Sequence, residues 1–168
     1  MSALEPSHLS PADWRLGLAK ACLELDKKLG PIMVCMTGPA GAGKTTLGRE
    51  IRKKGLPGIS RRRVAVIDDG VMAINVLGLF TRRIRDKGDC QDNLAPFARW
   101  LRGKSVVVYV AIRPWERVGR CDVLLRVHCS EAEREQRQAI RGKDYVLGVE
   151  QPPDRWVGVA RILDLTTG

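Results

Sequence analysis

Residues 38–45 carry a phosphate-binding pattern. They read Gly-Pro-Ala-Gly-Ala-Gly-Lys-Thr and satisfy GxxxxGK[ST]. Glycines at this spacing let backbone N–H groups converge on phosphate oxygens, and the helix that follows adds its positive dipole. We expect Lys44 to reach the β- and γ-phosphates of ATP and the Thr45 hydroxyl to hold Mg²⁺. The expected nucleotide-binding residues are Gly38, Pro39, Ala40, Gly41, Ala42, Gly43, Lys44, Thr45 and Thr46, with Arg134 joining them from later in the chain.

Two carboxylates follow the next strand-like run, at residues 64–67. Because parallel strands end at one edge of a sheet, Asp68 and Asp69 are expected beside the phosphate-binding loop. A carboxylate there can orient Mg²⁺ through water or accept the proton of an attacking hydroxyl. Asp68 is the candidate catalytic and metal-associated residue, and Asp69 a candidate substrate contact. The alternative is that one of them caps a helix beginning near Gly70.

Three arginines, Arg134, Arg137 and Arg141, lie on nearly one stripe of a helix predicted at residues 131–141, with Lys143 just beyond. Arginines that close over ATP stabilise the charge that spreads over the transferred phosphoryl group. Residues 130–145 are therefore predicted as a lid, with Arg137 and Arg141 as catalytic residues. Glutamates on the same helix favour the alternative of a salt-bridged helix exposed to solvent.

The elements that position these residues alternate along the chain. Ser10 and Pro11 are predicted to start a helix that ends before Gly30. Strands are predicted at 32–36, 64–67, 106–112, 123–127 and, less regularly, 159–163, and helices at 44–54, 71–79, 93–101 and 131–141. This alternation predicts a three-layer α/β fold with a mostly parallel sheet. We expect one domain over residues 1–168, with residues 1–30 as an N-terminal helical extension.

Composition agrees with a single globular domain. The 168 residues are 44% apolar and 29% charged, and no run approaches the roughly 20 apolar residues that cross a bilayer. Without a secretory signal at the start, a cytoplasmic location and no membrane partner are expected. Five cysteines without a CxxC pair and only two histidines predict neither a disulfide framework nor a zinc site.

With these parts in place the chain resembles the adenylylsulfate kinase branch of the small P-loop kinases, over about residues 32–166. Beyond the P-loop, several segments look like family motifs in the family's order. They are 66–70 (a strand ending in Asp-Gly-Asp), 92–98 with Gly103 (Glu-Asn-Ile-Arg), 107–117 (a strand and Ser-Pro-Tyr-Arg), 137–145 (the lid) and 148–152 (Gly-Ile-Asp-x-Pro). The resemblance implies a P-loop kinase fold with ATP and Mg²⁺ as cofactors.

The departures from this family fall on substrate positions. Residues 69–73 read Asp-Gly-Val-Met-Ala, so the second aspartate of Asp-Gly-Asp and the arginine after it are replaced. The tail also lacks the family's Tyr-Glu after its first proline. The phosphoryl-transfer machinery therefore carries over better than adenylylsulfate as the substrate.

The charge is unusual for a small-molecule kinase. The chain carries 29 Lys and Arg against 19 Asp and Glu, for a net charge of +10. Cations at 49–63 precede the second strand and are expected to be a solvated face or a remote phosphate contact. The cation clusters at 82–87 and 113–120 are expected to line a substrate groove, with Phe80 and Trp115 stacking on a base. Trp14, Trp100 and Trp156 are expected in the core. The candidate substrate-binding residues are Asp69, Phe80, Arg82, Arg83, Asn93, Arg113, Trp115, Arg117 and Lys143.

Phosphate neutralisation supplies much of the affinity for DNA, so this charge favours a DNA acceptor. The chain looks like the bacteriophage P-loop kinases that phosphorylate the hydroxymethyl group of 5-hydroxymethyluracil in DNA, which implies the host cytoplasm as its location. The first alternative is an adenylylsulfate kinase or another nucleotide or small-metabolite kinase. The second is a non-enzymatic ATP-binding nucleic-acid module, which would not need the lid arginines. The oligomeric state stays open.

Overall fold

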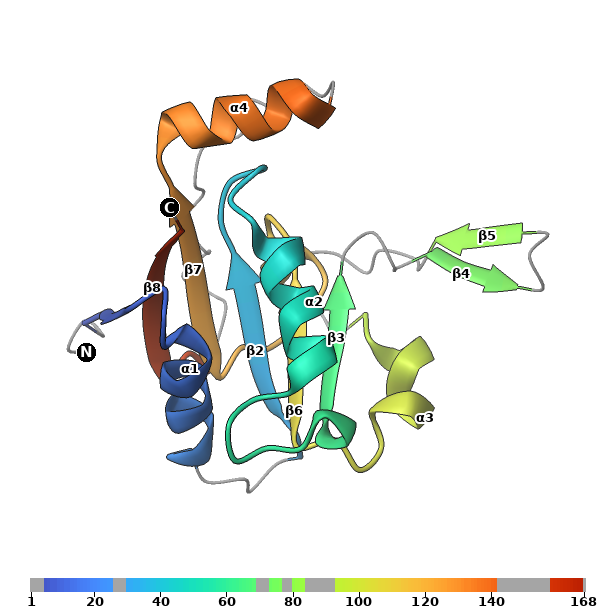
Figure 1. Cartoon of the computed structure of the whole chain (residues 1–168). Helices are drawn as coiled ribbons and strands as arrows, with labels where there is room; N and C mark the ends of the chain where they lie inside the picture. The colour runs from blue at the N-terminus through green and yellow to red at the C-terminus, as the bar shows by residue number, and fades with distance from the viewer. Residues whose placement is uncertain are drawn as a thin grey trace.

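A computed structural model describes residues 5–25, 30–68, 73–76, 80–83, 93–141 and 158–167. Its centre is a six-stranded sheet with the order β1-β8-β7-β2-β6-β3, in which every neighbouring pair is parallel (Figure 1). The strands are β1 (Ser7–Leu9), β2 (Ile32–Thr37), β3 (Val64–Asp68), β6 (Val106–Val110), β7 (Val123–Cys129) and β8 (Arg161–Thr167). The chain is thus an α/β protein, as the alternation of elements predicted.

The central strands are apolar runs because both faces of the sheet are covered. All six residues of β2 and all five of β6 are buried. One face packs against the helices α1 (Trp14–Leu23) and α2 (Lys44–Lys54). The other face packs against two segments. One precedes β6 and contains η3 (Ala95–Phe97) and α3 (Ala98–Leu101), and the other follows β6 and contains η4 (Pro114–Glu116). A parallel sheet covered on both faces is the arrangement that positions a ligand site at its carboxyl edge.

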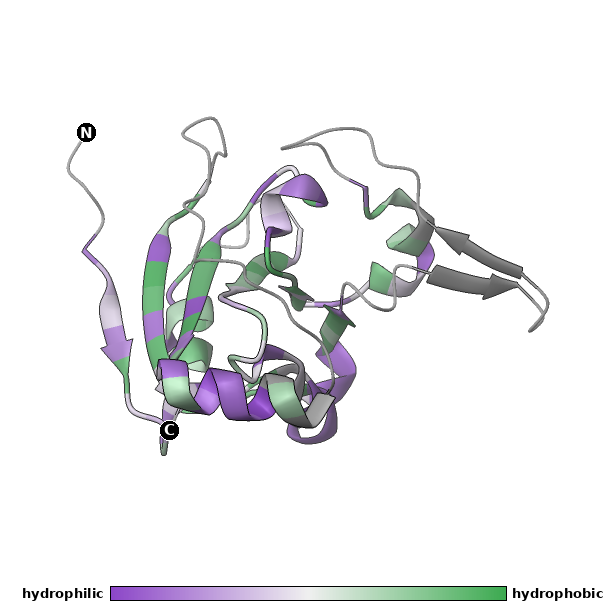
Figure 2. Cartoon of the chain, turned by 90° about the horizontal axis from the view of Figure 1, so that it is seen from above, coloured by the Kyte–Doolittle hydropathy of each residue, from purple (hydrophilic) through white to green (hydrophobic). Residues whose placement is uncertain are grey.

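Helix α4 (Glu131–Arg141) begins and ends where the sequence predicts. Ser130 caps it, because its Oγ accepts a hydrogen bond from the backbone N of Glu133 at 3.3 Å. Figure 2 shows hydrophilic residues along most of α4, whereas hydrophobic colouring is concentrated on the strands. In Figure 1 the helix lies across the carboxyl end of the sheet, above the loop that joins β2 to α2. The helix that begins the predicted lid therefore lies at the carboxyl edge of the sheet.

The N-terminal part of the chain differs from the prediction. Helix α1 starts at Trp14, not at Pro11, because residues 11–13 form a turn in which Asp13 N donates to Ser10 O at 3.1 Å. The segment predicted as a helical extension also contains a strand, β1, which pairs with β8. Trp14 and Leu18 are buried in the main core. Residues 5–25 are therefore part of the sheet domain.

Two predicted helices are corrected by the structure. Residues 73–76, predicted as helical within 71–79, form strand β4 (Ala73–Val76), which pairs antiparallel with β5 (Phe80–Arg83) in a separate two-stranded sheet. Apolar residues spaced for a helix also suit a strand, and cross-strand pairing decides between the two. The helix predicted at 93–101 is a 3-10 turn at Ala95–Phe97 followed by four helical residues, Ala98–Leu101. Phe97 N donates to Leu94 O at 2.8 Å, which is the hydrogen bond of a 3-10 turn and not of an α-helix.

Candidate functional site

The strand order identifies one edge of the sheet as the place to look for a site. β2 lies between β6 and β7, so the chain leaves β2 in one direction and later returns to its other side. In sheets of this kind ligands bind outside the carboxyl ends of the strands at such a reversal. The GxxxxGK[ST] loop follows β2 at this point, directly before α2 (Figure 1).

Glycines shape the loop between β2 and α2. Gly38, Gly41 and Gly43 have φ values of +143°, +87° and +89°, a region that side-chain-bearing residues rarely adopt. At Gly38 an added Cβ would also overlap the carbonyl oxygen of Val127 in β7. The loop therefore lies tightly against β7, and its conformation requires glycine at these points. Helix α2 begins at Lys44, so its first N–H groups face the same edge.

Lys44 is held inside the loop that precedes it. Its Nζ donates to the carbonyl oxygens of Gly38 at 2.6 Å and Pro39 at 2.7 Å, and the residue is only 8% exposed. Burial lowers the pKa of Lys44 to about 8, while the nearby Asp68 carboxylate, and to a smaller extent Cys129, opposes that shift. The ammonium predicted to bind phosphate therefore lies against the loop, and its protonation depends on burial and on nearby negative charge.

Asp68 ends β3 and faces the same edge. Its backbone is in register with Val110 of β6, and its side chain is half-buried. Because its charge raises the pKa of Lys44, the carboxylate lies within electrostatic range of that ammonium. The structure therefore brings together the P-loop lysine and the predicted catalytic carboxylate. Asp69 lies outside the described residues.

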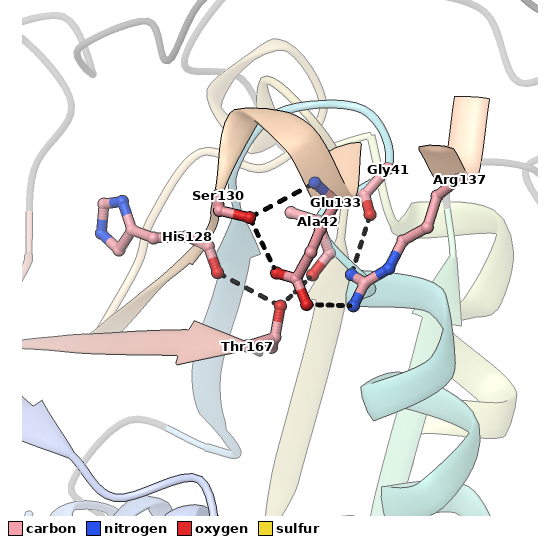
Figure 3. A network of polar contacts seen from close by, with 7 residues as sticks. All are labelled: Gly41, Ala42, His128, Ser130, Glu133, Arg137 and Thr167. Carbon is pink, nitrogen blue, oxygen red and sulfur yellow. Dashed lines mark hydrogen bonds and ion pairs between the residues drawn. The ribbon is translucent and has the colours of Figure 1, made fainter. Parts of the chain in front are cut away.

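Helix α4 contacts the P-loop through Arg137 (Figure 3). Arg137 Nη1 donates to the carbonyl oxygen of Gly41 at 3.2 Å, and Nη2 lies 3.9 Å from Glu133 Oε1. Glu133 is itself fixed by the capping residue, because Ser130 Oγ donates to Glu133 Oε2 at 3.2 Å. A predicted lid arginine therefore rests on the loop that carries Lys44. Arg141 ends the same helix, and its side chain is not described.

The last strand supplies a second contact to the P-loop, which sequence reasoning missed. Thr167 Oγ1 lies 3.1 Å from the carbonyl oxygen of Ala42 and 3.2 Å from that of His128, and its single proton serves one of them at a time (Figure 3). The hydroxyl joins the end of β8 to both the P-loop and β7. The strand predicted at 159–163 ends four residues before Thr167, whereas β8 extends to Thr167, so no signal in the sequence predicts this contact.

A pocket of about 270 Å³ lies beside the P-loop, lined by Pro39, His128, Cys129, Glu131 and Arg134. Arg134 Nη2 donates to Glu131 Oε1 at 3.1 Å. This pocket contains Arg134, the predicted nucleotide contact outside the P-loop. It offers a guanidinium, a carboxylate and an imidazole next to the loop predicted to bind phosphate.

A partly buried ion pair lies next to His128, one of the residues that line this pocket. Arg126 binds Asp164 through two hydrogen bonds, Nε to Oδ1 at 2.6 Å and Nη2 to Oδ2 at 2.7 Å, and His128 Nε2 lies 3.1 Å from Oδ1. Burial favours the neutral acid, but the hydrogen bonds from Arg126 and His128 outweigh it and lower the pKa of Asp164. The sequence does not reveal this cluster, because β7 and β8 are joined only by the tertiary structure.

Two of the predicted substrate residues, Asn93 before β6 and Trp115 after it, are buried. Asn93 is 1% exposed; its backbone N donates to Arg117 O at 3.0 Å and its Nδ2 to Glu116 O at 3.4 Å. Arg113 Nη1 donates to Glu116 Oε1 at 3.2 Å, and Trp115 is 5% exposed within the second core cluster. Asn93 and Trp115 thus have structural surroundings, and a base has no exposed indole face at Trp115 to stack on.

Other predicted substrate residues fall where side chains are not described. Phe80, Arg82 and Arg83 form β5, of which the structure describes only the backbone, and Lys143 lies outside the described residues. Among the described residues, groups of three or more His, Cys, Asp or Glu side chains suited to a metal are absent. Thr45 and Asp68 remain the residues predicted to help hold Mg²⁺, and their place beside Lys44 fits that role.

Each described helix is too short or too polar to cross a bilayer. Comparison with protein families finds no family model that matches this chain, and comparison with curated proteins finds no match either.

Proposed function

We propose that the protein is an ATP- and Mg²⁺-dependent kinase that transfers the γ-phosphoryl group to a hydroxyl. The observation that supports this most is the grouping of Lys44 and Asp68 at the carboxyl edge, beside a loop with three glycines at positive φ. A phosphate chain at this loop meets backbone N–H groups, the start of α2 and a lysine ammonium. A carboxylate within range of the same lysine provides an acceptor for a proton.

In the proposed reaction the acceptor hydroxyl attacks the γ-phosphorus, its oxygen forms the new bond, and the bond to the β-phosphate oxygen breaks to release ADP. Asp68 takes the hydroxyl proton. Lys44 leaves the carbonyls of Gly38 and Pro39 to neutralise the phosphates, and Arg137 leaves Gly41 O to stabilise the transferred group. Mg²⁺, held with the help of Thr45, supplies charge neutralisation on the phosphate oxygens.

The nucleobase of ATP is assigned to the pocket that contains Arg134. The pocket adjoins Pro39 in the P-loop, so a nucleotide whose phosphates lie in the loop can extend into it. Arg134 is available to stack on a base through its guanidinium plane, and Glu131 to accept a hydrogen bond from an exocyclic amine. Helix α4 then acts as the lid through both Arg134 and Arg137.

As the acceptor we propose the hydroxymethyl group of a modified pyrimidine, 5-hydroxymethyluracil, in DNA. The net charge of +10 and the replaced substrate motif at 69–73 support this choice over adenylylsulfate. Arg113 and Arg117 follow β6 toward the P-loop edge and are half-buried, so they are the described residues best placed to meet DNA phosphates.

A transfer assay with γ-labelled ATP tests the proposal. The acceptors are a duplex containing 5-hydroxymethyluracil, the same duplex with thymine, adenylylsulfate and a panel of nucleoside monophosphates. We expect label on the hydroxymethyl duplex alone, and none with Lys44→Ala. Label on adenylylsulfate or a monophosphate would replace the acceptor but keep the kinase. ATP binding without transfer to any acceptor would overturn the kinase in favour of a non-enzymatic ATP-binding module.

A further inference from the structure

At the end of the sheet opposite the P-loop, two segments distant in sequence lie side by side (Figure 1). η1 (Arg61–Arg63) leads into β3, and the turn after α3 leads into β6. β3 and β6 are parallel neighbours with Val64 opposite Val106, so the segments that enter them meet at one edge. Two hydrogen bonds join them: Ser105 N donates to Arg63 O, and Lys104 Nζ donates to Arg62 O, both at 2.7 Å.

This junction gathers cations that the sequence keeps apart. We call it the basal patch; it consists of Trp100 and the cations Arg61, Arg62, Arg63, Arg99, Arg102 and Lys104. All five arginines are exposed, and Lys104 is half-buried. Among the described residues, none of the six patch cations forms an ion pair with a carboxylate; the observed ion pairs involve cations elsewhere in the chain. Like charges gathered without counter-charges repel one another, and a bound polyanion relieves that repulsion.

The patch also has an exposed aromatic ring. Trp100, expected in the core, is 48% exposed. Its ring meets Phe97 edge-on, with centroids 6.4 Å apart and planes at 63°, and Lys104 Nζ lies 5.7 Å from its centroid. Since Lys104 is fixed in turn to Arg62 O, the indole is braced on two sides and still open to solvent. A braced ring among exposed cations provides a platform for a base.

We propose that the basal patch binds single-stranded nucleic acid, with phosphates on its arginines and a base stacked on Trp100. Arginine suits this role because its planar fork binds phosphate through two hydrogen bonds. A membrane surface fits less well, since the other exposed large apolar side chains of the described chain, Leu16 and Leu23, are on α1.

The basal patch is separate from the nucleotide site. The five residues of β3 separate the two edges by about 17 Å at roughly 3.3 Å per residue. Binding at the patch does not depend on phosphoryl transfer, so the two proposals stand or fall separately. If both hold, the patch retains a strand on the protein while another part of the nucleic acid reaches the P-loop edge.

The test measures binding of a fluorescent 15-nucleotide oligothymidine at several salt concentrations. Arg99→Ala with Arg102→Ala removes two phosphate contacts, so the slope of log affinity against log salt should become shallower by about 1.4, at roughly 0.7 per phosphate. Trp100→Ala should weaken binding roughly fivefold or more, and Trp100→Phe should restore part of the loss. The matched control is Lys20→Ala with Arg49→Ala, which removes the same charge from exposed positions outside the patch; its slope should match wild type.

Several results would overturn the proposal that the basal patch binds single-stranded nucleic acid. One is an equal change of slope in the control pair, which would reduce the effect to net charge. Another is tighter binding of a same-length duplex that Trp100→Ala leaves unchanged. A third is that the protein binds phosphatidylserine vesicles but not the oligonucleotide, and that the patch variants abolish the vesicle binding. Phosphoryl transfer from ATP, measured on the same variants, separates the two proposals. Patch variants that lose oligothymidine binding but keep normal transfer support the proposal for the basal patch. If the wild-type protein transfers no phosphate, the kinase proposal fails, but the binding result at the basal patch still stands.

Discussion

The two ends of the sheet both carry cations but hold them differently. At the P-loop edge Lys44 donates to two carbonyls, Arg137 to a third, and Arg134 to a carboxylate. At the basal edge the arginines of η1 and α3 are exposed and make no ion pair among the described residues. The first arrangement fixes charge at defined points, and the second leaves it free to follow a flexible polyanion.

This difference indicates what each end is suited to do. Catalysis needs charges that face the phosphates before the transition state forms. In the proposed reaction Lys44 and Arg137 are held beside the loop and turn to the phosphates when ATP replaces their carbonyl partners. Retention of a nucleic acid needs only a high local density of positive charge, and its strength falls with salt. The predictions below concern the P-loop edge and test whether its charges act through their position.

The largest effect is expected for Lys44→Ala. The substitution removes the ammonium that we propose binds the phosphates but leaves the buried strands and α2 unchanged, so transfer should be abolished while the fold is kept. Transfer of label and thermal unfolding measure the two properties. Lys53→Ala, an exposed cation on the same helix, is the control and should behave as wild type. Near-normal turnover in Lys44→Ala would remove the P-loop assignment.

Asp68→Asn should lower turnover roughly 10²-fold, the usual scale for a positioned base, with a smaller effect on ATP affinity. Steady-state turnover and equilibrium ATP binding separate the two. Glu135→Gln, an exposed carboxylate on α4, serves as the matched control. If Asp68→Asn loses ATP affinity and turnover in equal measure, the carboxylate acts on binding and not as the base.

The pKa of Lys44 predicts opposite pH effects on binding and folding. Above about pH 8 the folded protein loses the Lys44 proton, so ATP affinity should fall toward tenfold per pH unit. An unfolded lysine keeps its proton to about pH 10.4, so the unfolded chain binds more protons in this window and Lys44 adds stability as pH rises. Calorimetric titration and chemical unfolding between about pH 7 and 10 measure both. Lys44→Ala should remove both trends; trends that persist in this variant belong to another group.

The smallest effect is expected at Thr167. Thr167→Val keeps the shape but removes the hydroxyl that contacts the carbonyls of Ala42 and His128. One such hydrogen bond contributes about 0.5–1.5 kcal/mol, so KM for ATP should rise roughly 2- to 10-fold with a smaller change in kcat. Thr167→Ser restores the hydroxyl and should restore KM. If Ser behaves like Val, the methyl group and not the hydrogen bond holds the loop.

Local patterns in the sequence predicted the strand–loop–helix unit around residues 38–45 correctly. A continuous apolar run, glycines at fixed spacing and a basic amphipathic helix are contiguous, and α2 spans Lys44–Lys54 as predicted. Helix α4 was equally predictable because Ser130 and Glu133 form a capping pair at its start. Where neighbours in sequence make the stabilising contacts, sequence is sufficient.

The prediction failed where distant partners decide the structure. β1 has three residues, none of them buried, and forms because β8 offers a free edge. The helix predicted at 71–79 fits the apolar spacing, but residues 73–76 pair with 80–83 as a hairpin. Trp100 is apolar enough for a core, yet α3 ends after four residues and leaves the indole half-exposed.

By itself, then, the sequence determined the α/β class, the strand and helix that flank the GxxxxGK[ST] loop, and helix α4. Only the tertiary structure decided that Thr167 reaches Ala42 across 125 residues, that Arg126 meets Asp164 across 38, and that Lys104 joins Arg62 across 42. The reason is the order of the strands. Which strands are neighbours fixes which of their ends meet, and that order depends on the packing of the whole sheet, which no local pattern encodes.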